Sequence, residues 1–278
     1  MWTRRVRPVS VLMVGLTTLA MAAPLLWLLD TAFMGSKAMY STTLHVFPIP
    51  LTLSGFSQLN HLINFGRDFL NSVIVSISQT CGILVVGILA AYSFTRVQWT
   101  GRDVVFFIYV AAIAIPGWTL LIPLFLTVRE LGWIGTYQGL IIPGMISPIA
   151  IFLLRQFMIT LPRDLDDAAM VDGASKLRTL ISILVPNMYP GILAAGILAF
   201  LTTWNNLIWP LLVVNKTSMN TVPLGLSRLA VTGTGWGLNV YWGPLMAGTL
   251  LAALPTIALF VLAQKQFIGG LSLAGVRR

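Results

Sequence analysis

Six apolar stretches, each long enough for a membrane-spanning helix, constrain this sequence more than any other feature. They cover approximately residues 9–29, 72–94, 104–126, 140–157, 192–214 and 244–263. A helix needs about 20 mostly apolar residues to cross a bilayer, and it satisfies its backbone polar groups within the segment, as lipid requires. The sequence therefore predicts an all-α polytopic membrane protein with six transmembrane helices in a single domain, residues 1–278.

The composition supports this class and excludes others. Charged residues make up 9% of the chain and hydrophobic residues 57%, whereas soluble domains carry about 25% charged residues. The isoelectric point near 10.3 does not indicate nucleic-acid binding, because the basic residues lie scattered at the ends of apolar runs instead of forming a patch. The single cysteine excludes a disulfide framework and a cysteine zinc site.

The distribution of lysine and arginine predicts the orientation, because cytoplasmic loops carry an excess of both. With the N-terminus inside, twelve of the 17 basic residues fall on the cytoplasmic side and five outside. This imbalance favours two cytoplasmic termini and a cytoplasmic connection between the fourth and fifth spans. A signal peptide is the alternative for the first span, but its apolar run exceeds the usual 7–15 or so residues and five more spans follow.

The sequence shows no means of powering transport or catalysis by itself. No carboxylate, lysine or histidine lies in the middle of a predicted span, where ion-coupled transporters place an ionisable group or an unwound ion site. There is no phosphate-binding GxxxxGK[ST] motif and no HExxH or GxSxG motif. We therefore expect no enzyme activity and no cofactor in this chain, so that uphill transport would need energy from another chain.

The connection between the fourth and fifth spans, about residues 158–190, is unusually polar. Four of the chain's eight acidic residues lie within nine positions, at Asp164, Asp166, Asp167 and Asp172. We expect Asp164 to cap a short helix with two acids in its first turn, Gly173 to end it, and Ser175 to cap a second helix that stops at Pro186. Two short surface helices suit a soluble partner, although acids that merely cap a helix would also explain the charge.

This segment resembles the EAA loop of the inner-membrane permeases of ABC importers. That pattern reads Glu-Ala-Ala, three residues, Gly, nine residues, Ile, one residue and Leu-Pro; here Asp stands for Glu and Val for Leu at the same spacing. The resemblance implies that the segment couples the permease to an ATPase. The implied coupling residues are Asp167, Ala168, Ala169, Asp172, Gly173, Ala174, Ile183 and Pro186.

Further stretches resemble the carbohydrate branch of that family, and within it the six-span maltose permease subunit. They are Asn71-Ser72, the fifth-span sequence FLTTWNNLIWPLLVV and the C-terminal QKQFIGGLSLAGVRR. The function implied is ATP-driven import of a carbohydrate. A permease for glycerol-3-phosphate or a glycerophosphodiester is the alternative within the family, and a stand-alone channel or facilitator is the alternative of another class.

The resemblance also implies a set of partners and a location. A second permease subunit would complete a heterodimer, two ATPase subunits would hold ATP and Mg²⁺, and an extracytoplasmic binding protein would deliver the substrate. The chain would lie in the bacterial or archaeal cytoplasmic (inner) membrane.

Polar and aromatic residues within the spans are candidates for the substrate pathway, because a sugar needs hydrogen-bond partners and an aromatic face. The candidates are Asn71, Ser76, Gln79, Gly117, Trp118, Trp204, Asn205 and Asn206. The same side chains could instead bond across helices to the companion subunit. In the external segment 215–243, the candidates for contact with the binding protein are Gly233, Gly235 and Trp236, in a stretch that could equally be an ordinary connector.

Overall fold

The computed structural model describes residues 8–39, 51–230 and 240–275, and in this part of the chain it contains helices and no strand. Three long helices, α1 (Pro8–Ala32), α4 (Phe65–Thr95) and α15 (Trp242–Gly275), include segments that are long and apolar enough to cross a membrane. Three bent helix pairs also reach membrane length. The fold is therefore that of an all-α polytopic membrane protein, with three spanning helices, or six if each bent pair is one span.

The bent pairs are assembled from short helices. Arg102–Ala114 meets Gly117–Glu130 at 97°, Tyr137–Gly144 meets Pro148–Thr160 at 46°, and Lys176–Asn187 meets Tyr189–Trp204 at 81°. Their elements are α5 (Arg102–Ala111), η1 (Ala112–Ala114), η2 (Gly117–Leu120), α6 (Leu121–Glu130), α7 (Tyr137–Ile141), η3 (Ile142–Gly144), α8 (Pro148–Thr160), α10 (Lys176–Thr179), η4 (Leu180–Leu184), α11 (Val185–Asn187) and α12 (Tyr189–Trp204). The other elements are α2 (Ser36–Met39), α3 (Ser54–Leu62), α9 (Asp164–Val171), α13 (Ile208–Val213), η5 (Thr217–Met219) and α14 (Val222–Ala230).

Proline lies at each bend. Pro116 precedes η2, Pro148 begins α8 after the capping residue Ser147, and Pro190 is in the first turn of α12. Proline has no backbone N–H and its ring clashes with the preceding turn, so it breaks a helix in its interior but is tolerated in the first turn. The bends therefore follow from the local sequence.

The chain divides into two compact units. The first comprises residues 1–66 and 225–254, and the second residues 67–224 and 255–278. In the first unit the rings of Phe33 and Phe56 lie 5.3 Å apart, and Gly55 packs so closely on Gly243 that an added Cβ would lie 2.8 Å from the Gly243 carbonyl oxygen.

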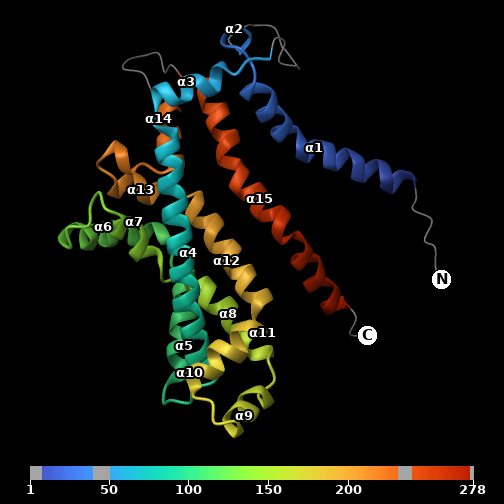
Figure 1. Cartoon of the computed structure of the whole chain (residues 1–278), viewed down its shortest axis with the longest axis vertical. Helices are drawn as coiled ribbons and strands as arrows, with labels where there is room; N and C mark the ends of the chain where they lie inside the picture. Colours follow the sequence, from blue (N-terminus) through green and yellow to red (C-terminus); the bar gives the residue numbers. More distant parts are fainter. Residues whose placement is uncertain (1–7, 40–50, 231–239, 276–278) are drawn as a thin grey trace. The chain divides into compact units, whose positions relative to one another are not determined.

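The second unit contains the polar segment and the core that supports it. Leu154 and Met158 of α8 pack against Leu184 of η4 and Met188, and all four side chains are buried, together with Ala91 of α4. Figure 1 shows α4, α8 and α12 within this unit, with α9 at its tip beyond α10 and α11. Buried apolar side chains therefore connect the polar segment to α4, α8 and α12.

The contact between α8 and α12 generates a prediction about packing. A Cβ on Gly191 would overlap the ring of Phe157, whereas one on Gly196 would lie 3.4 Å from Leu84, an ordinary contact. Gly191→Ala should destabilise the chain by about 1–3 kcal/mol through overpacking. Gly196→Ala, on the same helix, should be neutral or stabilising, because alanine favours helix over glycine by about 1 kcal/mol. The midpoint of thermal unfolding in detergent measures both effects, and equal midpoints would contradict the assigned packing.

Candidate functional site

The acidic helix α9 begins one residue earlier than its sequence suggests. Arg163, not Asp164, occupies the N-cap position, and its carbonyl oxygen accepts hydrogen bonds from the backbone N–H groups of Asp166 (2.8 Å) and Asp167 (3.1 Å). The prediction that Asp164 caps the helix is therefore wrong, because Arg163 already has helical backbone angles and moves Asp164 into the first turn. All three acids of that turn still face the positive end of the helix dipole.

Gly173 ends α9 as predicted. Its φ of +74° lies in the left-handed region, which a residue without Cβ adopts at no steric cost. The Gly173 N–H bonds to the Met170 carbonyl at 3.0 Å and the Ala174 N–H to the Ala169 carbonyl at 2.9 Å. These two bonds form a Schellman motif, which satisfies the last carbonyls of the helix and reverses the chain.

The second helix of the polar segment starts as predicted but ends later. The Ser175 hydroxyl accepts a hydrogen bond from the Arg178 N–H at 3.4 Å, as an N-cap does. The helical run continues through the π-helical η4 and past Pro186 to Asn187. The predicted end at Pro186 is wrong because Pro186 lies in the first turn of α11, where no N–H is needed.

The two faces of α9 differ in character. Ala169 faces inward and is buried, whereas Asp167 is exposed. Met170 and Val171 are 70% and 87% exposed although both are apolar. Of the other predicted coupling residues, Ala168, Asp172, Gly173 and Pro186 are exposed, and Ala174 and Ile183 are half-buried. The outward face of α9 therefore combines acidic and apolar side chains.

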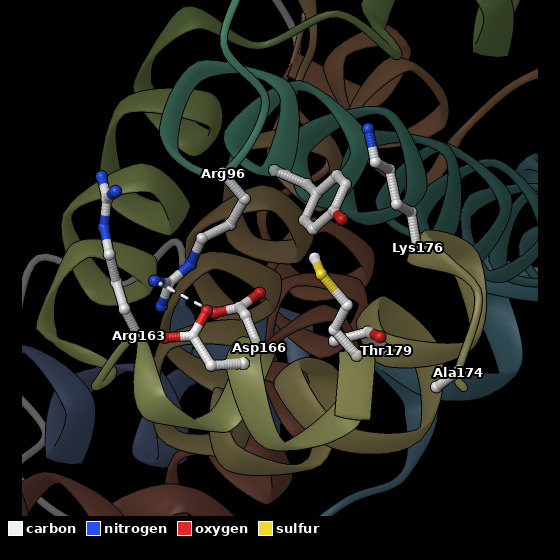
Figure 2. A pocket seen from close by; sticks show the side chains of 9 residues that line it. Arg96, Arg163, Asp166, Ala174, Lys176 and Thr179 are labelled. Atoms are coloured by element: carbon white, nitrogen blue, oxygen red, sulfur yellow. Dashed lines mark ion pairs between the residues drawn. The ribbon is translucent and has the colours of Figure 1, made fainter. Parts of the chain in front are cut away.

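A pocket of about 180 Å³ lies behind α9. Arg96, Arg163 and Lys176 supply basic side chains to its wall, and Asp166 and Asp167 supply acidic ones. Figure 2 shows Arg96 reaching toward Asp166, while Lys176 stands apart from that pair. An ion pair joins Arg96 Nη1 to Asp166 Oδ2 at 3.2 Å. The neighbouring acids therefore differ: Asp166 pairs with Arg96, whereas Asp167, which also lines the pocket, is exposed.

The polar candidates on α4 bond to other segments of this same chain. Asn71 donates from Nδ2 to the carbonyl oxygens of Ser218 (3.0 Å) and Asn220 (2.8 Å), and its Oδ1 accepts from the Tyr137 hydroxyl at 2.7 Å. Gln79 Nε2 donates to a further backbone carbonyl in η3, at 3.3 Å. The sequence left two roles open for these side chains, contact with the substrate and bonding to the companion subunit. The structure adds a third role, hydrogen bonding within this chain.

Ser76, Gln79 and Asn206 converge on a small cavity that apolar residues also line. It also includes Thr203 and Thr221, and its volume is about 10 Å³. A cavity of roughly this size holds a single water molecule. A sugar does not fit between these side chains in this conformation.

Trp204 and Asn205 lie where the fifth apolar stretch is interrupted. The α12 helix ends at Trp204 and α13 begins at Ile208, so the stretch expected as one continuous helix is broken. Asn206 Oδ1 accepts a hydrogen bond from the Trp209 N–H at 3.2 Å, and such local side-chain bonds compete with helix continuation. Trp204 is buried, with its ring stacked on that of Phe200 at 5.6 Å, whereas Asn205 is exposed at the break.

The remaining candidates have different surroundings. Gly117 and Trp118 form part of the bend between α5 and α6, and Trp118 is 68% exposed. Gly233, Gly235 and Trp236 lie outside the described residues. In the described part of the chain, no group of three or more His, Cys, Asp or Glu side chains could hold a metal ion.

Sequence reasoning missed two residues that organise these sites. In the sequence Arg96 is one of several basic residues at the ends of apolar runs, and its partner Asp166 lies far along the chain. Tyr137 sits just before the fourth apolar stretch and carries the hydroxyl that bonds Asn71. Neither pairing has a signal in local periodicity, because both depend on which helices become neighbours.

The membrane-length helices, with the polar helix α9 between two of them, define a polytopic membrane protein with an exposed surface element. Residues 83–268 match the family of binding-protein-dependent transport system inner membrane components. The chain belongs to this family.

Relatives in several bacteria agree with this assignment. The chain is 33% identical to the arabinooligosaccharides transport system permease protein AraQ of Halalkalibacterium halodurans, over 96% of this chain and 95% of the relative. It is 31% identical to the sn-glycerol-3-phosphate transport system permease protein UgpE of Pectobacterium atrosepticum, over 81% and 84%. A bacterial ABC transporter involved in import of the acidic polysaccharide alginate shares the fold, with a TM-score of 0.82, 19% identity, and coverage of 95% of this chain and 98% of that chain.

The hydrogen bonds of Asn71 lead to a prediction about stability. Asn71→Leu should destabilise the chain by about 1–3 kcal/mol or more, because two carbonyls and the Tyr137 hydroxyl lose a buried partner. Tyr137→Phe should cost less, about 1 kcal/mol, since it removes a single hydrogen bond. Thermal unfolding in detergent compares the two variants. A Tyr137→Phe variant as unstable as Asn71→Leu would contradict this ranking.

Proposed function

We propose that this chain is the permease subunit of an ATP-driven ABC importer for a carbohydrate, and that α9 docks on a separate ATPase subunit. The observation that carries the docking role is the exposure of Met170 and Val171 on a helix with an acidic first turn. Exposed apolar side chains rimmed by charge are typical of protein-binding surfaces. The Schellman turn at Gly173 supports the same role, because it presents α9 as a defined, protruding helix.

The energy for transport comes, in this proposal, from ATP and Mg²⁺ held by two ATPase subunits. A second permease chain forms a heterodimer with this one, and an extracytoplasmic binding protein delivers the substrate. Closure of the ATPase dimer would move α9 and shift the membrane helices between two states, and each ligand would stabilise the state that it binds better. Both termini and α9 lie in the cytoplasm, as the distribution of basic residues favours, in a bacterial or archaeal inner membrane.

A neutral carbohydrate is the favoured substrate. The family includes permeases named for arabinooligosaccharides and for glycerol-3-phosphate. A phosphate group calls for a basic side chain in the pathway, and no lysine or arginine lies mid-span in the predicted spans. Asn205 and Trp118 are exposed and offer an amide and an aromatic face, whereas Asn71, Ser76 and Trp204 are enclosed and support the pathway from behind.

The docking role predicts a specific loss of affinity. Val171→Ser should weaken binding of the ATPase subunit about tenfold, because burying a valine contributes roughly 1.5 kcal/mol and a factor of ten corresponds to about 1.4 kcal/mol. The affinity is measured by adding increasing amounts of the ATPase subunit to the purified permease and determining how much of it stays bound. Val85→Ser is the matched control, since Val85 is 58% exposed but lies in the middle of α4. Unchanged ATPase affinity in Val171→Ser would exclude the docking role.

The substrate is tested through the associated binding protein. We expect neutral oligosaccharides to bind it and to stimulate ATP hydrolysis by the reconstituted transporter, and glycerol-3-phosphate to do neither. Equilibrium binding and phosphate release are the two measurements. Stimulation by glycerol-3-phosphate alone would select the alternative substrate, and uptake that continues without ATP would instead indicate a stand-alone facilitator.

A further inference from the structure

One arginine side chain joins three elements at the end of the second unit. Arg96 directly follows α4, and its side chain is 7% exposed. Its Nη2 donates to the carbonyl oxygens of Met158 (3.2 Å) and Leu161 (2.9 Å), and its Nη1 lies 3.2 Å from Asp166 Oδ2. The guanidinium therefore contacts the last turn of α8, the residue that caps it, and the first turn of α9.

The chemistry of these acceptors suits arginine in particular. The guanidinium is planar, permanently charged and carries five donors in a fixed fork. The carbonyl groups at the C-terminal end of α8 carry partial negative charge, and the Asp166 carboxylate adds a full one. A lysine ammonium is a compact point charge and lacks the fork that spans acceptors on different elements.

The covalent connection between α8 and α9 is short, and the side chain of Arg96 adds a second link between the two helices. It consists of residues 161–163, where the chain leaves α8 at Leu161 and enters α9 at Arg163. Next to Arg96, the Thr95 hydroxyl donates to the Ala91 carbonyl at 2.7 Å and lies 3.0 Å from Met158 Sδ. The end of α4 is thus fastened to the end of α8, and Arg96 extends this fastening to α9.

The ion pair has a geometry that can change. Nη1 and Oδ2 are close but not aligned as a hydrogen bond, and Arg96 Nε has no hydrogen-bond partner among the described residues. The adjoining pocket of about 180 Å³ gives both side chains room to move. A bidentate pairing, in which two donors of the guanidinium meet the carboxylate, is the stronger arrangement for these groups. The contact can therefore tighten or loosen without repacking of the apolar core.

We infer that Arg96 is a positioning residue that transmits displacement of α9 to α4 and α8. This inference rests on the proposed docking of α9, and it gives different roles to neighbouring side chains of the helix. Val171 is exposed and does not line the pocket behind α9, Asp167 and Met170 are exposed and also line that pocket, and Asp166 pairs with Arg96. Loss of the contact between Asp166 and Arg96 should leave docking intact and uncouple the helices from it.

The test uses the complete transporter in proteoliposomes, with the partner permease, both ATPase subunits and the binding protein. Arg96→Gln and Asp166→Asn should each lower the substrate transported per ATP hydrolysed by about fivefold or more, the lower end of common coupling strengths. Both variants should still retain the ATPase subunits. The double variant should resemble the single ones, because the two groups act as one unit. Arg163→Gln is the matched control, since Arg163 lines the same pocket but is exposed, and it should keep the wild-type ratio.

The outcomes separate the two proposals. A wild-type transport ratio in Asp166→Asn, or additive losses in the double variant, would overturn the role of Arg96. The Asp166→Asn variant keeps the test decisive if Arg96→Gln fails to fold, because Arg96 then retains both carbonyl acceptors. Failure of the wild-type chain to retain the ATPase would instead refute the docking of α9. A normal ATPase rate with a reduced transport ratio is the signature of lost transmission, which a general loss of stability does not produce.

Discussion

The position of the polar segment depends on one buried apolar contact in the second unit. In this contact Leu154 and Met158 pack against Leu184 and Met188. These side chains belong to α8 on one side and to the run from η4 into α12 on the other. All four side chains are buried and closely packed. Because a packed core resists displacement, this contact holds both ends of the polar segment in place. Only with its base held in this way can α9 expose Met170 and Val171 and still keep one orientation.

Polar groups perform the complementary task inside the apolar bundle. A polar group removed from water must be hydrogen-bonded or it destabilises the fold, and two polar side chains of the second unit find their partners on distant segments. Asn71 connects α4 to residues 218–220 and to Tyr137, and Arg96 connects α4 to α8 and α9. Each polar side chain is thus also a cross-link, which gives a bundle of broken helices defined attachments at its two ends.

Breaks in the helices distinguish this chain from a bundle of simple spans. The bends at 97° and 81° lie next to prolines, and the break between α12 and α13 is filled by Asn206. Interrupted backbone is tolerated at membrane depth where protein or a water-filled cavity satisfies it. The break between α12 and α13 leaves Asn205 exposed, and contact of Asn205 with the substrate stays a prediction.

Local chemistry was readable from the sequence: apolar length predicted the spanning helices, glycine at 173 predicted the left-handed turn, and Ser175 predicted a cap, because each depends on neighbours within a few residues. The N-cap at Arg163 and the helix end at Asn187 could not be read from the sequence. An acid fits either the N-cap or the first turn of a helix, and a proline can either follow the end of a helix or lie in the first turn of the next one. Only the tertiary structure decided which of two adjacent acids forms an ion pair within the chain. Asp166 and Asp167 are the same residue type in the same turn, and they differ because Arg96 pairs with Asp166. Arg96 lies some seventy positions before Asp166 in the sequence, yet its Nη1 is 3.2 Å from Asp166 Oδ2.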